Sequence, residues 1–354
     1  METKIAVIIA TLIATPVFAQ SARSTMKAVV VHEYGGPEVL KLEDVPRPVP
    51  KENEILVKVI AAGVNPVDSA ARSQKFAQFL NIKLPAIPGY DIAGVVEKTG
   101  ATVTRLKAGD PVYAYIALDK GGGYAEYALA TEKETSPRPK SLNYVEAAAV
   151  PLVSLTAWQA LIDTAKLSAG QTVLIHGGSG GVGSFAIQIA KARSARVFAT
   201  ASTPNQDLLK QLGADVAIDY TKQKFEDVAK DVDVVLDSVG KDTLTRSYGI
   251  VKKGGIIVSL VARPDQAELD KRGIRGASLG VEPNSDELAE ITKLIDERKI
   301  KVIVSQTLPL AEAAKAQTQV DTHHTRGKIV LKVAEEPRQP ENRSQRSNVS
   351  GSTF

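Results

Sequence analysis

The chain has 354 residues, which predicts about two domains at the usual ~100–200 residues per domain. Charged residues make up 24% and hydrophobic residues 44%, the mix of a folded globular protein. The net charge is only +4, which does not indicate nucleic-acid binding. Cysteine is absent, which excludes disulfides, thiolate nucleophiles and cysteine-ligated zinc or iron–sulfur centres.

The N-terminus has the layout of a secretory signal peptide. Lys4 precedes an apolar run of ten residues, and the letters VFA then precede Gln20 as a cleavage site. The run is shorter than the ~20 apolar residues that cross a bilayer. We therefore expect residues 1–19 to be removed on export to the periplasm or the exterior. The alternative is that translation starts at Met26, which would make the protein cytoplasmic.

The C-terminal residues 334–354 show no apolar period, and their three Glu residues balance three Arg residues. Such a segment buries too little apolar surface to offset its ordering entropy. The sequence predicts a disordered tail.

Between these ends the chain has two textures. Up to about residue 143, short apolar or alternating runs are separated by Gly and Pro turns, which is typical of a mainly β domain. Beyond residue 145, strand patterns alternate with helical patterns, which predicts a parallel α/β sheet. The expected strands are 28–32, 55–62, 92–97, 112–116, 172–176, 196–201, 216–219, 234–237 and 256–260, and the expected helices are 181–192, 205–212 and 286–298.

A glycine-rich turn joins one such strand to a helix. Its letters GGSGGVG satisfy G-x-G-x-x-G, and the glycines would let the backbone approach a pyrophosphate at the helix N-terminus. The alternative is a tight turn without a ligand. The residues predicted to bind a dinucleotide here are Gly178, Ser179, Gly180, Gly181, Val182 and Gly183.

The end of the next strand indicates which dinucleotide is bound. Enzymes that prefer NAD place Asp or Glu there to hold the ribose hydroxyls. Here the strand 196–201 ends in Ser202 and Thr203, whose hydroxyls can donate hydrogen bonds to a 2′-phosphate. The sequence therefore predicts NADP(H). No Lys or Arg directly follows Thr203 to pair with the phosphate, and the next one along the chain is Lys210.

With these features together, the chain resembles the medium-chain dehydrogenase/reductase superfamily. Within it, the chain is similar to the zinc-independent quinone oxidoreductases and the related NADPH-dependent enone reductases, over about residues 26–333. The resemblance rests on ordered motifs along the chain: MKAVVVHEYGGPEVL, GVNPVD, PGYDIAGVV, GDPVYAY, GGYAEYA, PLVSLTAWQAL, GGSGGVG, LGADVAIDY and TRGKIVL.

The chain departs from the zinc branch of this superfamily at its metal ligands. Asn65 stands in place of a ligand Cys, and Tyr90-Asp91 replace His-Glu. We expect no metal, and therefore no Lewis acid to polarise a plain alcohol or carbonyl. The resemblance implies an acceptor activated by its own conjugation, either a quinone or an α,β-unsaturated carbonyl.

The resemblance also implies the architecture. A GroES-like catalytic domain, residues 26–150 and 300–333, would be interrupted by a Rossmann domain, residues 151–299, that binds NADP(H). The small-molecule substrate would lie in the cleft between them, and the protein would form a homodimer.

Several site residues follow from the resemblance. Asn65 would donate a hydrogen bond to the substrate oxygen, and Asp68 would lie near the nicotinamide ribose. Thr156 matches a threonine beside the nicotinamide carboxamide. Tyr90 and Tyr124 are candidates for the proton donor, with water as the alternative.

Further residues match the cofactor subsites. Tyr220 would close over the 2′-phosphate, and Lys328 would add a positive charge there. Asn205-Gln206 replace a lysine that family members often place beside this phosphate. Ser259 and Leu260 would face the nicotinamide through their backbone.

Two other functions stay open at this point. One is a nicotinamide-binding protein without turnover, which would serve as a sensor or a structural component. The other is a zinc-dependent alcohol dehydrogenase, which the missing ligands disfavour.

Overall fold

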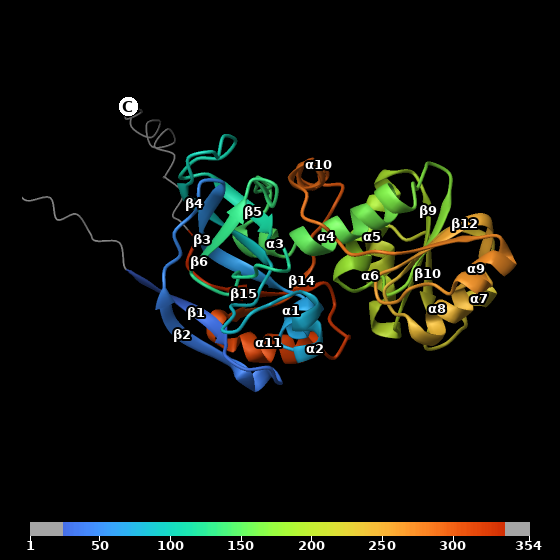
Figure 1. Ribbon diagram of the computed structural model, residues 1–354. Helices are drawn as coiled ribbons and strands as arrows, with labels where there is room; N and C mark the ends of the chain where they lie inside the picture. The colour runs from blue at the N-terminus through green and yellow to red at the C-terminus, as the bar shows by residue number, and fades with distance from the viewer. Residues whose placement is uncertain (1–23, 337–354) are drawn as a thin grey trace, which may run out of the picture.

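The computed structural model describes residues 24–336, which form two lobes joined side by side (Figure 1). Each lobe is built around its own β-sheet. Helices α4 (Pro151–Trp158) and α10 (Ser285–Asp296) lie at the junction between the lobes. Among the described residues, no helix is long and apolar enough to cross a membrane.

The first lobe contains a seven-stranded sheet and a separate β1–β2 hairpin. Both ends of the chain contribute to the large sheet, because β15 pairs antiparallel with β3. The strands are β1 (Thr25–Val31), β2 (Leu40–Pro46), β3 (Glu54–Val64), β4 (Asp91–Thr99), β5 (Pro111–Tyr115), β6 (Tyr127–Thr131), β7 (Thr135–Pro137), β14 (Val304–Pro309) and β15 (Lys328–Lys332), and the helices are α1 (Pro66–Ala71), α2 (Gln74–Phe79), α3 (Tyr144–Ala148) and α11 (Ala313–Val320).

The second lobe is a six-stranded, all-parallel sheet in the order β10-β9-β8-β11-β12-β13. This order reverses between β8 and β11, which is where doubly wound sheets bind ligands. The strands are β8 (Thr172–Ile175), β9 (Arg196–Ala201), β10 (Val216–Asp219), β11 (Val232–Asp237), β12 (Val251–Ser259) and β13 (Arg275–Ser278), and the helices are α5 (Gly181–Ala192), α6 (Gln206–Gln211), α7 (Phe225–Val228), α8 (Lys241–Ser247) and α9 (Gln266–Arg272).

Both faces of the parallel sheet are buried. Successive strand residues point to opposite faces, so in β8 Val173 and Ile175 join one core while Leu174 joins the other. The first core also includes Tyr90 and Tyr113 from the other lobe, so a continuous apolar core extends across the junction. The predicted α/β fold with a doubly wound parallel sheet is confirmed.

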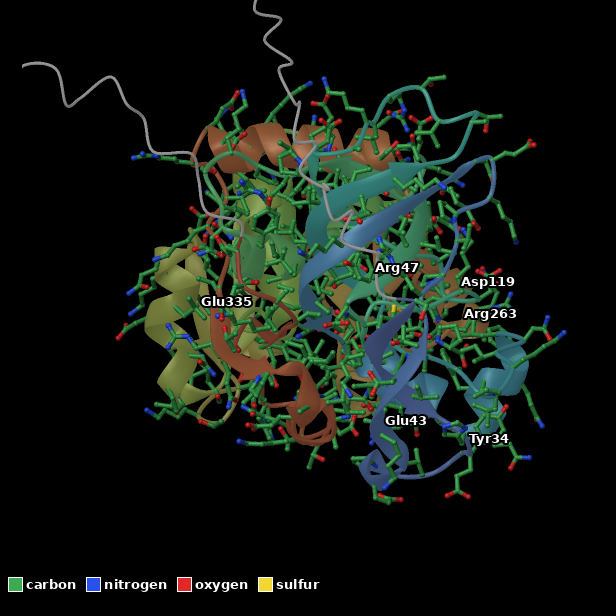
Figure 2. All side chains as sticks on the ribbon, turned by 90° about the vertical axis from the view of Figure 1, so that its left-hand side faces the viewer. Tyr34, Glu43, Arg47, Asp119, Arg263 and Glu335 are labelled. Carbon is green, nitrogen blue, oxygen red and sulfur yellow. The ribbon has the colours of Figure 1, made fainter. Side chains whose placement is uncertain are left out.

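On the side of the first lobe that faces away from the second lobe, side-chain contacts hold the segment after β2 against the large sheet. Arg47 donates from Nη2 to Glu97 Oε1 at 2.8 Å, and its guanidinium lies 3.7 Å from the ring centroid of Tyr127. Figure 2 looks onto this end and shows Arg47 near its centre and Tyr34 beside the short helices α1 and α2. The Tyr34 hydroxyl donates to the carbonyl oxygen of Ile82.

The predicted terminal segments lie partly outside the described residues. The predicted signal peptide, residues 1–19, lies outside them, as does most of the predicted tail. The first three tail residues are ordered, so the prediction of disorder from residue 334 is wrong there. The amide of Ala334 donates to the Ile60 carbonyl, and the Glu336 carboxylate accepts from the amide of Tyr144. These hydrogen bonds to the first lobe supply order that the tail's own composition does not provide.

His176 directly follows β8 and is buried under α8. Its ring packs edge-on against Phe225, with 4.6 Å between centroids. The Ser247 hydroxyl donates to the Thr243 carbonyl, so His176 Nε2 must be the donor to Ser247 Oγ, at 3.0 Å. Nδ1 then accepts from the Thr200 hydroxyl at 3.2 Å. Burial lowers the pKa of His176 to about 4, so the ring is neutral at neutral pH.

We expect His176 to make the stability of the protein sensitive to acid. Its pKa is lower in the folded chain than in the unfolded one, so its contribution is complete above pH ~6.5 and falls by about 3 kcal/mol on acidification to pH ~4. Urea unfolding at pH 7.5 and pH 5 should show His176→Gln less stable than wild type at the higher pH, with a smaller difference at the lower pH. The exposed His324→Gln is the control. A difference that stays constant with pH would contradict this assignment.

Candidate active site

The glycine turn between β8 and α5 has no room for side chains at two of its glycines. A Cβ on Gly183 would lie 2.2 Å from the carbonyl oxygen of Gly177, and one on Gly178 would lie 2.8 Å from Leu209 Cδ2. Gly177 has a φ of +69°, which L residues rarely adopt. Ser179, Gly180, Gly181 and Val182 remain partly exposed at the N-terminus of α5. The turn therefore fits a pyrophosphate held by backbone amides at a helix N-terminus.

A carboxylate that the sequence analysis missed lies beside the end of β9. Asp219, at the end of the adjacent strand β10, accepts a hydrogen bond from the Thr203 hydroxyl at 2.5 Å. The Thr203 proton is thus engaged by Asp219 in this structure, and the contact of this hydroxyl with a 2′-phosphate stays a prediction. Ser202 accepts from Asn205 Nδ2 at 3.3 Å and keeps its own hydroxyl proton for a ligand.

Tyr220 follows β10 and is half exposed, with 52% of its surface accessible. It borders an open pocket of about 460 Å³ whose walls include Lys222, Lys224 and Arg246. Lys222 also lies 3.7 Å from the Asp219 carboxylate. Lys222 is thus a cation close to the strand end where Asp219 meets Thr203.

A cluster of polar side chains lies buried where the first lobe meets the glycine turn. We call Asn65, Asp68, Asp91, Tyr124 and Lys328 the buried cluster; each is at most 4% exposed. Asn65 Nδ2 donates to Asp91 Oδ2 at 2.9 Å, and the Asn65 oxygen accepts from the Lys328 ammonium. Asp68 Oδ2 accepts from the Tyr124 hydroxyl and from the backbone N–H of Asn65, both at 2.7 Å.

Burial changes the protonation of this cluster. Ionisation of both carboxyl groups and the ammonium would leave a net negative charge away from water. Desolvation raises the pKa of Asp68 to about 7 and also raises the pKa of Asp91, while it lowers the pKa of Lys328. Asp68 Oδ1 has no hydrogen-bond partner among the described residues. Asp68 therefore holds a proton below about pH 7, whereas Asp91 is compensated by Lys328.

The position of Lys328 corrects its predicted role. Its ammonium donates to the Val64 carbonyl at 2.8 Å and to Asn65, and it lies 3.5 Å from Asp91 Oδ2. All three ammonium protons thus have acceptors on buried residues, in or beside the buried cluster. Lys328 is therefore not available as the cation beside Tyr220, and the prediction that it adds charge to the 2′-phosphate subsite is wrong.

Lys328 nevertheless lies close to the cofactor turn. Its Cδ would be 3.1 Å from a Cβ placed on Gly181, so the lysine side chain passes the N-terminus of α5. The amide of the preceding residue, Gly327, donates to the Ser179 carbonyl at 2.8 Å. The start of β15 thus joins the glycine turn to the buried cluster.

The predicted catalytic residues differ in how they are placed. Tyr90 is 1% exposed, and burial raises its pKa. Tyr124 is fully buried, and its proton is donated to Asp68. Thr156 donates to the Leu152 carbonyl at 2.7 Å, so its hydroxyl can only accept from a ligand such as an amide N–H. The roles given to these side chains stay predictions.

Ser259 and Leu260 are held by Asp237 at the end of β11. The Ser259 hydroxyl donates to Asp237 Oδ2 at 2.7 Å, and the amide of Leu260 donates to the Asp237 carbonyl. Asp237 Oδ1 accepts from the amides of Val239 and Gly240. Ser259 is fully buried and its hydroxyl is bonded to Asp237, so its side chain is not available to a ligand. The backbone contact of Ser259 and Leu260 with the nicotinamide stays a prediction.

Two of the important charges were not assigned from the sequence. Asp91 was noted only as a departure from a zinc motif, and Asp219 was not considered. The sequence feature that could have identified Asp91 and Asp219 is the position of each at one end of a strand. Side chains at the ends of neighbouring strands lie close together in the folded sheet. For Asp219, the parallel register of β9 and β10 was needed to place it against Thr203.

Comparison with known families places two models on the chain. The model described as alcohol dehydrogenase GroES-like domain matches residues 51–140. The model described as zinc-binding dehydrogenase matches residues 212–331. The GroES-like part expected for the first lobe is thus confirmed.

The chain is similar to curated proteins over most of its length. It is 39% identical to the NADPH-dependent alkenal/one oxidoreductase of Arabidopsis thaliana, over 86% of this chain and 79% of that protein. It is 35% identical to the quinone oxidoreductase of Mus musculus, over 85% of this chain and 95% of that protein.

Solved structures give the same picture. The quinone oxidoreductase of Coxiella burnetii matches with a TM-score of 0.82 at 37% identity, covering 87% of this chain and 99% of that one. The Escherichia coli quinone oxidoreductase complexed with NADPH matches with a TM-score of 0.79 at 29% identity, covering 87% of this chain and 100% of that one.

Proposed function

Because the chain belongs to the zinc-independent quinone oxidoreductase branch of the medium-chain dehydrogenase/reductase superfamily, we propose that it transfers hydride from NADPH to quinones or α,β-unsaturated carbonyls. One observation carries this proposal. Lys328 passes the glycine turn of the second lobe and binds Asn65 of the first, so the dinucleotide turn and the buried cluster are adjacent. Relatives named for alkenal/one and for quinone reduction support both acceptor classes.

The residues present fit NADP(H). The glycine turn offers a cradle that Cβ atoms would fill, and the pocket beside Tyr220 offers Lys222 and Lys224 for a phosphate. When bound, the cofactor supplies the hydride, and the protein supplies orientation and electrostatics. Thr156 could accept a hydrogen bond from the carboxamide, and Asp237 fixes the backbone that would face the nicotinamide.

Asn65 is the residue that we assign to the acceptor oxygen. One N–H of the Asn65 side chain donates to Asp91, and the side-chain oxygen accepts from Lys328. The second N–H can donate to the acceptor oxygen on which negative charge develops. Its side chain is fully buried, so the acceptor reaches it only by displacing neighbouring side chains as it binds. A conjugated acceptor needs less stabilisation than a plain carbonyl, because its own π-system spreads the charge.

The same side chains do not fit a zinc ion. The Asn65 oxygen and the Asp91 carboxylate already bind the Lys328 ammonium, so a second cation there would be repelled. The described residues contain no group of three or more His, Asp or Glu side chains that could hold a metal. The donor set thus disfavours a zinc-dependent alcohol dehydrogenase.

A homodimer is part of the proposal. Strand β13 lies at an edge of the parallel sheet, with backbone groups that a second copy could pair. Light scattering after gel filtration would give twice the chain mass if this holds, and the single-chain mass if it does not.

Export is also part of the proposal, since the residues before Gln20 follow the order charged, apolar, cleavage site. Mass spectrometry of the protein from fractionated cells should find a mature chain that begins at Gln20, outside the cytoplasm. A cytoplasmic chain that begins at Met26 would contradict export and leave the reductase assignment unaffected.

We expect chelator-treated protein to oxidise NADPH in the presence of quinones and enones. The measurement is the loss of NADPH absorbance with an acceptor panel, with NADH in parallel and a saturated ketone as the control acceptor. Tight NADPH binding without turnover on any acceptor would contradict the enzyme and favour a sensor. Activity that depends on added zinc would instead support the alternative function, a zinc-dependent alcohol dehydrogenase.

We expect Asp219→Asn to favour NADPH further over NADH, because it removes a negative charge from the subsite that would hold the 2′-phosphate. The ratio of kcat/KM for NADPH to that for NADH should rise up to about fivefold, the upper end of what one charge contact near the surface contributes. Asp207→Asn, on the exposed side of α6, is the matched control. An unchanged or lower ratio would contradict this position of the phosphate.

A further inference from the structure

Lys328 has an arrangement that a structural ion pair alone does not require. It is 4% exposed, and its three protons go to three different oxygens, on Val64, Asn65 and Asp91. Only one of these acceptors is a carboxylate. The other two belong to the segment that carries Asn65, so the charge is shared between Asp91 and the proposed substrate-binding residue.

These contacts fix which way the Asn65 amide faces. An ammonium group can only donate and a carboxylate can only accept, so the Asn65 oxygen must face Lys328 and its nitrogen must face Asp91. If the amide turned over, it would place N–H groups against Lys328 and an oxygen against Asp91. Two charged neighbours therefore exclude the opposite orientation.

The same contacts strengthen the remaining N–H of Asn65. A cation on the amide oxygen withdraws electron density from the nitrogen, and a chain of hydrogen bonds in a region without water reinforces this polarisation. The remaining N–H is the only donor of Asn65's side chain that is not engaged.

We propose that Lys328 is a positioning residue that orients and polarises Asn65 as the hydrogen-bond donor to the acceptor oxygen. Lys328 itself transfers no proton, because its ammonium keeps all three protons in hydrogen bonds to Val64, Asn65 and Asp91. The hydride comes from NADPH, and the proton that completes the reduction comes from another donor or from water. The inference rests on the proposed function of Asn65.

The decisive experiment is a double-mutant cycle on the full chain with NADPH and an acceptor that wild type reduces. We expect Asn65→Ala and Lys328→Met each to lower kcat about 100-fold, the size of losing one oxyanion donor. Since Lys328 acts through Asn65, the double variant should be within about threefold of Asn65→Ala. Effects that multiply would show that Lys328 acts independently and would overturn the proposal.

A second variant separates positioning from folding, because Lys328→Met leaves Asp91 as an unpaired buried charge. Lys328→Met with Asp91→Asn is neutral, and Asn65 can turn over to bond with the new amide. We expect this pair to recover the Tm lost by Lys328→Met while kcat stays low. If kcat returns with Tm, Lys328 is merely structural and the proposal fails.

Two controls complete the design. Lys332→Met, at the exposed end of the same strand, removes an equal charge and should leave kcat and Tm near wild type. NADPH binding by fluorescence titration should change less than threefold in Lys328→Met, and a larger loss would assign Lys328 to the cofactor instead. Absence of turnover in wild type would refute the proposed function itself, and full activity in Asn65→Ala would refute only the donor role.

Discussion

The buried contact between Lys328 and Asp91, shared with Asn65, is the interaction on which the site depends. Removing an ammonium and a carboxylate from water is costly, and the pair is tolerated because other hydrogen bonds complete it. Asp91 Oδ1 accepts from the amide of Leu152 at the start of α4, while Lys328 begins the strand that returns to the first lobe. One ion pair therefore joins β4, β15, α4 and the Asn65 segment at the point where the lobes meet.

The two ends of the site differ in their exposure to water. Around Asn65 the polar groups are buried and paired, so electrostatic effects there are strong and a single charge alters its neighbours. At the end of β10 the Asp219 side chain is largely covered, but its neighbours Tyr220 and Lys222 are exposed, so the charge of Lys222 is screened by solvent. In the proposed function, the first end orients the reacting group. The second end selects between dinucleotides by the balance of several weaker contacts.

Several features could be predicted because they depend on residues near in sequence. The spacing of Gly178, Gly180 and Gly183 after an apolar run predicts a turn into α5, since the steric reason for each glycine is local. Helix α5 extends over Gly181–Ala192, as its pattern predicts. The alternation of strand patterns with helical patterns predicts the doubly wound sheet, because each pattern is also local. Composition predicts a disordered tail, yet residues 334–336 are ordered by hydrogen bonds to β3 and α3.

What the sequence determined by itself is the fold class, the dinucleotide turn and the absence of cysteine ligands, because periodicity, glycine sterics and composition need no partner. The tertiary structure decided which charges meet. Lys328 is 263 positions from Asn65, and Asp91 is 26 positions from it, so no local pattern could assign Lys328 to the buried cluster instead of the phosphate. Asp219 lies beside Thr203 because β9 and β10 are adjacent and parallel, with Asp219 paired to Ala201. Electrostatic interactions act through space, and the sheet order alone brings these side chains within hydrogen-bonding distance.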